Sequence, residues 1–281
     1  MINRYQGIIS NLENWGKSSE KMSAAIIIGS QARADHSSDE YSDLDVIIFT
    51  EDPDFFIKSD QWLNRIGNFH VSFVENSIDG QKEKRVLFEN ALDVDFVIVS
   101  NKIVSSDLTR SDAIAILGHG YRILVDKIGV QEILSRININ KQTYIIKSEK
   151  EYQNIVNDFW YHSVWTAKKL MRAEFWTAKM CLDSYMKWKL LAIIELYEHA
   201  KHGVQYNTWH SGRFIEEWAE PRIIEKLSCC FSHYNKNDIK AALLSTMDLF
   251  RLIVVETAEI LHFEYPKGAD EYSSNWVNKN L

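Results

Sequence analysis

Residues 26–49 read IIIGSQARADHSSDEYSDLDVIIF, and this stretch decides how the first half of the chain folds. Two apolar runs, at 24–28 and 44–50, have the length and the branched side chains of buried strands. Asp43 and Asp45 lie two residues apart at the start of the second run. Side chains with that spacing point to the same face of a strand, so the two carboxylates are neighbours. Neighbouring carboxylates beside a core repel each other unless a cation lies between them or one is protonated.

A second pair of aspartates, Asp93 and Asp95, has the same spacing in an apolar run at 91–100. If the two acidic strands pair, three or four carboxylates meet at one point of the sheet. Mg²⁺ prefers oxygen ligands and commonly combines one or two carboxylates with phosphates of a substrate. Such a group of acids is typical of two-metal phosphoryl or nucleotidyl transfer.

Gly29 and Ser30 stand between the first strand and a predicted short helix, SQARA. A helix N-terminus offers unpaired N–H groups and positive potential to a phosphate. Glycine lets the backbone approach closely, and the serine hydroxyl can donate a hydrogen bond to a phosphate oxygen. We therefore expect a phosphate site here. A chance acidic surface is the alternative, and the order of strand, Gly-Ser, polar loop and in-strand acids argues against it.

The remaining segments predict the fold class. In the first half, further strands are predicted at 70–75, 84–89 and 121–127, and a helix at 106–117. Several connections are too short for crossover helices, so we expect a mixed or mostly antiparallel sheet. From about residue 150 the pattern is helical, with later helices at 221–232 and 238–262. The prediction is an α+β protein, with a sheet domain over 1–145 and a helical bundle over 146–281.

The composition narrows the kind of protein. The 281 residues carry a net charge of −7, which disfavours a large nucleic-acid interface. Nine acidic residues fall between positions 35 and 60 against Lys58 alone, a field that suits a divalent cation or a cationic substrate. The sequence has no apolar run of about 18 residues, no signal-peptide pattern and no disulfide framework among its cysteines. We therefore expect a cytoplasmic protein that does not contact membranes.

The segment GSQARADHSSDEYSDLD, together with the later DVDF, resembles the nucleotidyltransferase fold of the polymerase-β type. The resemblance implies that Gly29 and Ser30 contact the triphosphate of a nucleotide. It also implies that two Mg²⁺ ions are bound by Asp43, Asp45 and Asp95. The third acid of that family often serves as general base, so Asp95 is the candidate for this role and Asp93 the weaker one.

The rest of the chain is similar to the streptomycin or aminoglycoside 6-adenylyltransferase family. The similar segments are GYRILVDK, NDFWYHSVWTAKKLMRAE, MKWKLL and LHFEYP, at 120–127, 157–174, 186–191 and 261–266. The resemblance implies that AMP is transferred from ATP to a hydroxyl of streptomycin, with release of pyrophosphate, by a monomer or homodimer. Gln31 stands where many relatives have Arg, and this departure leaves the acceptor open.

Basic residues of the helical half are candidates to bind the nucleotide. Apolar residues from Trp160 to Leu182 recur at the spacing of a helix. If that helix is continuous, one face of it carries Lys168, Arg172 and Lys179. Lys168 and Arg172 are the candidates to hold the β- and γ-phosphates, with a solvated basic stripe as the alternative.

Acidic residues of the same region are candidates to bind the acceptor. An aminoglycoside is polycationic, so its site should present carboxylates and aromatic rings. Asp158 and Glu174 lie beside tryptophans and are the candidates, with ordinary surface acids as the alternative.

Two other functions stay open at this point. The same chemistry could act on another acceptor, such as a lincosamide or a protein side chain. The chain could also be a catalytically silent nucleotide-binding module. The sequence names neither the modified hydroxyl nor a preference for ATP over other nucleotides.

Overall fold

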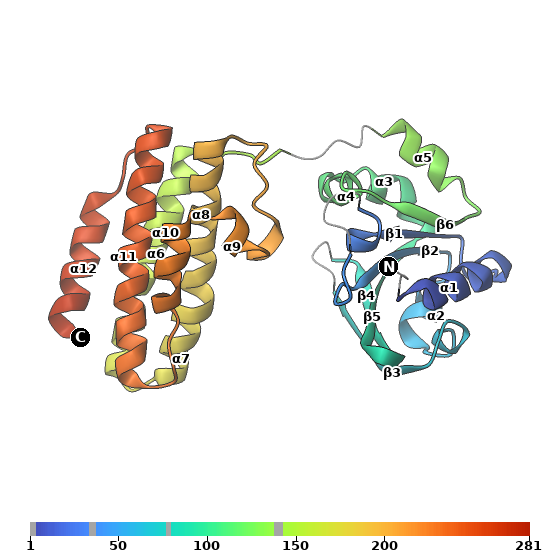
Figure 1. The fold of residues 1–281 in the computed structure, drawn as a ribbon, viewed down its shortest axis with the longest axis horizontal. Helices are drawn as coiled ribbons and strands as arrows, with labels where there is room; N and C mark the ends of the chain where they lie inside the picture. The colour runs from blue at the N-terminus through green and yellow to red at the C-terminus, as the bar shows by residue number, and fades with distance from the viewer. Residues whose placement is uncertain (1–3, 34–37, 77–79, 138–142) are drawn as a thin grey trace. The chain divides into compact units, whose positions relative to one another are not determined.

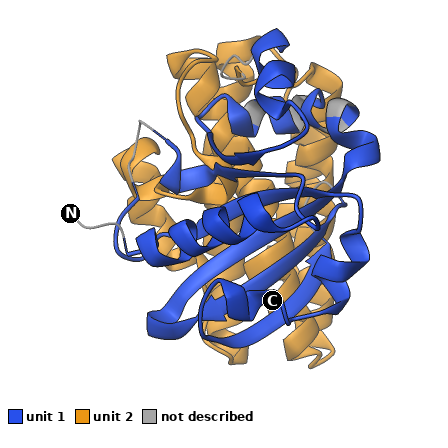
Figure 2. Ribbon diagram, turned by 90° about the vertical axis from the view of Figure 1, so that its right-hand side faces the viewer, with its two compact units in different colours: residues 1–142 blue, residues 143–281 orange. Residues whose placement is uncertain are grey.

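The computed structural model describes residues 4–33, 38–76, 80–137 and 143–281. The chain divides into two compact units, residues 1–142 and 143–281, which are coloured separately in Figure 2. Each unit has apolar clusters of its own. The functional division, with nucleotide chemistry in 1–145 and substrate binding in 146–281, stays a prediction.

Among its described residues, the first unit is built on a six-stranded sheet with the order β3-β4-β5-β2-β1-β6 (Figure 1). The strands are β1 (Ala24–Ile28), β2 (Leu44–Thr50), β3 (Phe69–Asn76), β4 (Lys82–Phe88), β5 (Leu92–Ser100) and β6 (Arg122–Asp126). β2 and β5 run parallel, whereas the other neighbouring strands run antiparallel. The sheet is therefore mixed, and together with the helical second unit it confirms the predicted α+β class.

Helices pack on both faces of this sheet. They are α1 (Gln6–Ser18), α2 (Pro53–Lys58), α3 (Val104–Leu108), α4 (Ser111–Leu117) and α5 (Val130–Arg136). On one face, α1 and α2 bury Leu12 and Phe56 in a cluster with Val46 and Phe96 of the sheet. On the other face, α3, α4 and α5 form a cluster with β1 and with the C-terminal halves of β2 and β5. This second layer leaves the N-terminal ends of β2 and β5 outside its cluster.

The helix predicted at 106–117 is two short helices, α3 and α4, which are separated at Thr109 and Arg110. Two hydroxyls in this segment donate to backbone carbonyls, Ser106 to Ile103 and Thr109 to Ser106. Such local hydrogen bonds compete with a regular helix, which explains the break.

The second unit is a bundle of helices. They are α6 (Glu149–Met171), α7 (Phe175–Met180), α8 (Met186–His202), α9 (Ile215–Trp218), α10 (Pro221–Leu227), α11 (Lys236–Leu261) and α12 (Lys267–Asn280). α6 begins at a capping box, in which Ser148 and Glu151 exchange hydrogen bonds. In the core, the rings of Phe159 on α6 and Phe250 on α11 stack with their centroids 3.5 Å apart.

The helical spacing between Trp160 and Leu182 does not form one continuous helix, so the condition for a shared basic face is not met. α6 ends at Met171, Ala173 has a left-handed conformation with φ of 60°, and α7 begins at Phe175. A π-helical turn, Cys181–Tyr185, then leads into α8. The apolar spacing continues across the break, so the pattern alone does not reveal it.

Two details of the C-terminal helices also differ from expectation. The helix predicted at 221–232 ends at Leu227 and continues as a 3₁₀ turn, Ser228–Cys230. α12 is not predicted, because two of its three buried residues, Asp270 and Ser273, are polar and only Val277 is apolar. Asp270 is held there by Arg251, whose Nε and Nη2 donate to the two carboxylate oxygens at 2.7 and 2.8 Å.

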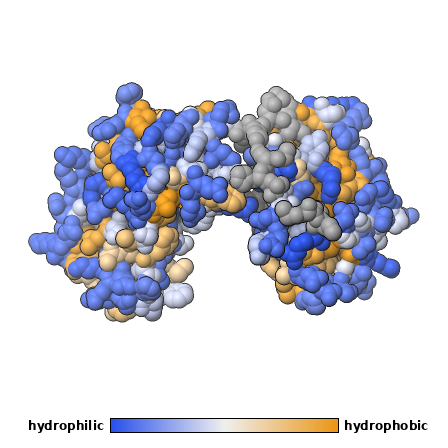
Figure 3. Space-filling view, in the orientation of Figure 1, coloured by the Kyte–Doolittle hydropathy of each residue, from blue (hydrophilic) through white to orange (hydrophobic). Residues whose placement is uncertain are grey.

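Within the part of the chain that the structure describes, no helix combines the length and the hydropathy that a membrane span requires. Hydrophilic residues cover most of the face drawn in Figure 3, and hydrophobic residues form small groups between them.

Candidate active site

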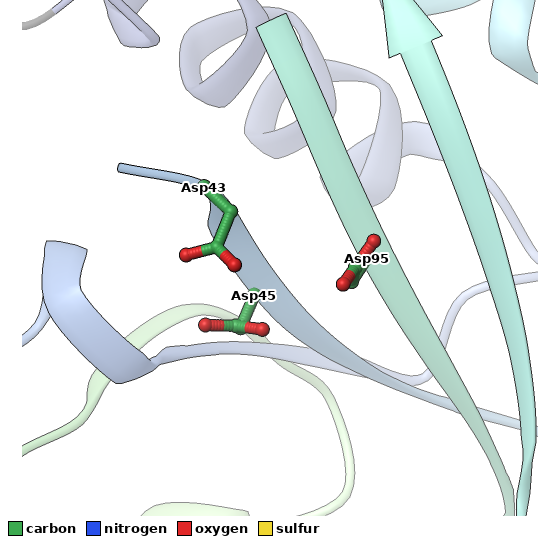
Figure 4. A group of neighbouring side chains, drawn as sticks. All are labelled: Asp43, Asp45 and Asp95. Atoms are coloured by element: carbon green, nitrogen blue, oxygen red, sulfur yellow. The ribbon is translucent and has the colours of Figure 1, made fainter. Parts of the chain in front are cut away.

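Three aspartates converge on the face of the sheet that carries α3, α4 and α5. Asp43 directly precedes β2, Asp45 lies on β2, and Asp95 lies on β5 (Figure 4). The parallel pairing of β2 with β5 sets Asp45 directly opposite Asp95. One carboxylate oxygen from each of the three residues lies within 4.8 Å of the other two. The structure thus brings together the three acids that the sequence analysis selects.

Gly29 is required where β1 approaches these acids. Its φ is +68°, a left-handed backbone conformation that residues other than glycine rarely adopt. A Cβ atom at this position would also lie 2.1 Å from Oδ2 of Asp45. The backbone of Gly29 therefore touches the Asp45 carboxylate because no side chain keeps them apart.

Ser30 ties the same turn to the start of β2. Its hydroxyl donates to the backbone carbonyl of Asp43 across 3.4 Å. In place of the helix expected over SQARA, the structure has only a 3₁₀ turn, Gly29–Gln31. Ala34, the last residue of the predicted helix, lies outside the described residues. A turn of this length has few free N–H groups, so the predicted helix-dipole contribution to phosphate binding is weaker than expected.

Burial and charge make Asp95 unusual. Asp95 is only 9% exposed to solvent. Burial raises the pKa of Asp95 to about 7; Arg85 opposes the shift, and the carboxylates of Glu83 and Asp43 add to it. A hard divalent cation would offset the repulsion among the three aspartates. The donor set, oxygen atoms only and rich in negative charge, fits Mg²⁺.

Arg85 and Glu83 on β4 complete the surroundings of Asp95, and the sequence analysis does not select them. Arg85 pairs with Asp95 across the β4–β5 ladder, with 3.5 Å between Nη1 and Oδ2. Its Nε lies 3.3 Å from Oε1 of Glu83. The sequence holds a signal for this pairing, because the predicted strands 84–89 and 91–100 are nearly contiguous and can form a hairpin. A hairpin closed at Asn90 sets Arg85 opposite Asp95.

Asp93, the weaker candidate for the base, lies apart from the three aspartates. It is on the same face of β5 as Asp95, and its Oδ1 accepts a hydrogen bond of 3.0 Å from the hydroxyl of Tyr5. It does not belong to the group of carboxylates that lie close enough to share a metal ion.

The basic candidates of the second unit have separate surroundings. Lys168 lies on α6, with Nζ 5.3 Å from the ring centroid of Trp276. It lines a hollow of about 350 Å³ between α6 and α12. Arg172 follows the last residue of α6, and its Nε lies 2.7 Å from Oε1 of Glu174. Lys179 lies beyond the break, on α7, and contacts Asp183, so the three basic residues do not share one helix face.

The acidic candidates of the second unit are already paired with cations of the same unit. Asp158 lies 2.7 Å from Nζ of Lys189 and accepts hydrogen bonds from the hydroxyl of Tyr185. Glu174 lies 2.7 Å from Nζ of Lys169, in addition to its contact with Arg172. A cationic ligand would have to displace these partners.

A mixed sheet that presents a Gly-Ser turn beside three convergent aspartates defines the nucleotidyltransferase class. The model of the family described as streptomycin adenylyltransferase matches residues 2–280, so the chain belongs to that family. The resemblance found in the sequence is thereby confirmed.

Curated relatives agree with this family. The chain is 21% identical over 273 residues to the aminoglycoside 6-adenylyltransferase of Campylobacter jejuni, an alignment that covers 94% of this chain and 91% of that protein. It is 21% identical over 266 residues to the aminoglycoside 6-adenylyltransferase of Bacillus subtilis (strain 168), with 90% and 91% covered. A crystal structure of an aminoglycoside 6-adenyltransferase from Bacillus subtilis has a TM-score of 0.47 and 18% identity, and covers 99% of this chain and 98% of that one.

Proposed function

We propose that this protein transfers AMP from ATP to a hydroxyl of a streptomycin-like aminoglycoside and releases pyrophosphate. The observation that carries the proposal is the convergence of Asp43, Asp45 and Asp95 beside the turn at Gly29. Membership of the streptomycin adenylyltransferase family supports it.

In this proposal the three acids bind the metal ions, and the turn at Gly29 and Ser30 contacts the phosphates. Asp43, Asp45 and Asp95 would hold two Mg²⁺ ions, which when bound stabilise the negative charge that develops on the transferred phosphoryl group. Gly29 has no side chain to block a phosphate, and Ser30 adds a hydroxyl donor at the same turn.

Asp95 would also accept the proton of the attacking hydroxyl. A buried carboxylate beside the metal-binding acids is placed to take that proton as the oxygen attacks. Arg85, opposite it on β4, positions this carboxylate from the side away from Asp45.

The second unit would supply the remaining contacts. Lys168 and Arg172 are the proposed partners of the β- and γ-phosphates, and the aromatic hollow around Lys168 offers rings beside that charge. Asp158 and Glu174 are proposed to bind the acceptor, in exchange for the cations that they now contact.

The test is a pyrophosphate-release assay with Mg²⁺, four nucleoside triphosphates and a panel of aminoglycosides and lincosamides. We expect release with ATP and streptomycin, and its loss when EDTA removes the metal. Asp45→Asn should lower turnover by about a thousandfold or more, because it removes a carboxylate that no neighbour replaces. Near-normal turnover of Asp45→Asn would contradict the proposal.

The control is Asp54→Asn, which changes an exposed acid on α2 that pairs with Lys58. It should leave turnover unchanged. If only lincosamides are modified, the chemistry stands and the acceptor is wrong. If ATP binds and no acceptor releases pyrophosphate, the chain is a silent nucleotide-binding module.

A further inference from the structure

A row of side chains crosses four strands on the face that carries the aspartates. The register places Asp45 of β2 opposite Asp95 of β5, Asp95 opposite Arg85 of β4, and Arg85 opposite Phe73 of β3. Residues two positions away on a strand share this face. The row therefore extends, over β3, β4 and β5, into a surface formed by Val71, Phe73, Glu75, Glu83, Arg85, Leu87 and Asp93, here named the β3–β5 surface.

Apolar side chains on this surface are open to solvent. Val71, Phe73 and Leu87 are 49%, 51% and 37% exposed. The helices that pack on the same face of the sheet form their cluster with β1, β2 and β5, and not with β3 or β4. An exposed apolar group on an edge strand is a liability unless a ligand or partner covers it.

Carboxylates surround these apolar groups. Arg85 is the hub: its Nε lies 2.5 Å from Oε1 of Glu75 and 3.3 Å from Oε1 of Glu83, and its Nη1 faces Asp95. Asp93 adds a further carboxylate on the same face. Three carboxylates, those of Glu75, Glu83 and Asp95, therefore contact one guanidinium, and the surface keeps an excess of negative charge directly beside the three aspartates.

The pairing of acidic residues differs between the two units, and this difference indicates a cationic ligand for the β3–β5 surface. Asp158 and Glu174 are matched by cations of their own unit, whereas the β3–β5 surface is not neutralised by its single arginine. Neighbouring strands are about 5 Å apart, so Phe73 lies only about 10 Å across the sheet from Asp95. A molecule of several rings would reach from the apolar side chains to the general base.

We propose that the β3–β5 surface binds the acceptor, with an ammonium or guanidinium group against the exposed Glu75 and a sugar ring against Phe73 and Leu87. The proposal rests on the proposed function, since it adds contacts on the first unit for the cationic acceptor of that reaction, beyond those proposed for Asp158 and Glu174. Its occupant is a polycationic small molecule, because excess carboxylate and exposed aromatic surface together favour such a ligand.

The experiment uses the full chain and two variants of exposed residues, Phe73→Ser and Glu75→Gln. Neither side chain is buried, so both variants should fold. We expect each to raise the KM for streptomycin about tenfold, since Phe73→Ser removes the apolar contact with the sugar ring and Glu75→Gln removes the charge that faces the cation, while the KM for ATP stays within about twofold. The matched control is Val74→Ser, which changes the opposite face of the same strand and should leave both constants unchanged.

Calorimetric titration with streptomycin and with spermidine, without nucleotide, separates this proposal from the proposed function. If the wild type transfers nothing but binds a cation that both variants lose, the function fails and the surface stands. An unchanged KM for streptomycin in both variants overturns the surface and leaves the function intact. A wild type that binds neither cation also overturns it. So does a wild-type dimer that Phe73→Ser converts to a monomer, because β3 would then pair with a second copy.

Discussion

At the scale of single residues, Gly29 is the position that the geometry constrains most. Its positive φ and the contact with Oδ2 of Asp45 are independent reasons for glycine. The first is a matter of backbone strain, and the second is a matter of space beside a carboxylate that we propose as a metal ligand. A substitution therefore damages stability and activity by different routes, which experiments can separate.

We predict that Gly29→Ala lowers turnover at least a hundredfold and costs about 1–2 kcal/mol of unfolding free energy. The added methyl group forces Asp45 aside, and the left-handed backbone is strained. Turnover and urea denaturation measure the two effects.

Gly129→Ala is the control, because Gly129 has φ of +75° and its nearest neighbour would lie 4.0 Å from a Cβ. It should lose similar stability and keep its turnover. Equal turnover in the two variants would refute the steric argument at Gly29.

Glu195 on α8 gives a prediction about pH. Burial raises the pKa of Glu195 to about 7, and Lys147 opposes the shift. The folded state therefore holds a proton that the unfolded state releases above its ordinary value of 4.5. The stability that this proton provides is complete below that value and is lost as the pH rises through about 7.

We predict that Glu195→Gln is more stable than the wild type at pH 8, by up to about 3 kcal/mol, and equally stable at pH 4.5. The glutamine keeps the shape and cannot ionise. Thermal unfolding at both pH values measures the difference. Glu259→Gln, which changes an exposed glutamate on α11, is the control substitution. A stability difference for Glu195→Gln that is the same at both pH values would contradict the explanation.

At the scale of elements, the break between α6 and α7 depends on one residue. Ala173 has φ of 60°, and its N–H donates to the carbonyl of Leu170 as the chain leaves α6. Glycine is the residue usually found in this conformation at a helix C-terminus. The chain thus stores a small strain at the point where the apolar pattern predicts an uninterrupted helix.

We predict that Ala173→Gly raises the unfolding free energy by about 0.5–1 kcal/mol, because it relieves the left-handed strain. Ala241→Gly, at an exposed position within α11, should lower it by about 1 kcal/mol. Both are measured by denaturant unfolding. If the two substitutions destabilise equally, Ala173 is not strained.

The elements that could be predicted from the sequence are those that depend on local residue patterns. Strands of branched apolar residues, such as Ala24–Ile28 and Leu44–Thr50, are predicted at their observed bounds. The meeting of Asp45 with Asp95 is anticipated only as a condition, since pairing of distant strands is not a local property. Arg85 is missed for the same reason. α12 is missed because its apolar contacts, at Ala269, Trp276 and Val277, are few and share the buried face with the ion pair of Asp270 and Arg251.

At the scale of the whole molecule, the two units have separate hydrophobic cores. The clusters of the first unit draw on residues between Tyr5 and Ile137, and that of the second on residues from Tyr144 onward. Within the described chain, no apolar cluster contains residues of both units. Each unit should therefore fold without the other.

We predict that residues 143–281, expressed alone, give a helical protein that unfolds cooperatively. Residues 1–142, expressed alone, should bind Mg²⁺ and fail to adenylylate any acceptor, because the proposed contacts of Lys168 and Arg172 are missing. Circular dichroism and the pyrophosphate assay provide the measurements. Transfer by the first unit alone would show that the helical unit is dispensable.

The three aspartates come together only when β2 and β5 pair in the register that sets Asp45 opposite Asp95. A strand that slips by one residue turns every side chain to the other face. Such a slip of β5 would drive Asp95 among the apolar side chains beneath α1 and α2, and would turn Val94 and Phe96 to the face that carries the aspartates. The same error thus destroys both core and site. Active-site titration of a purified sample therefore does not count molecules in which β5 is out of register.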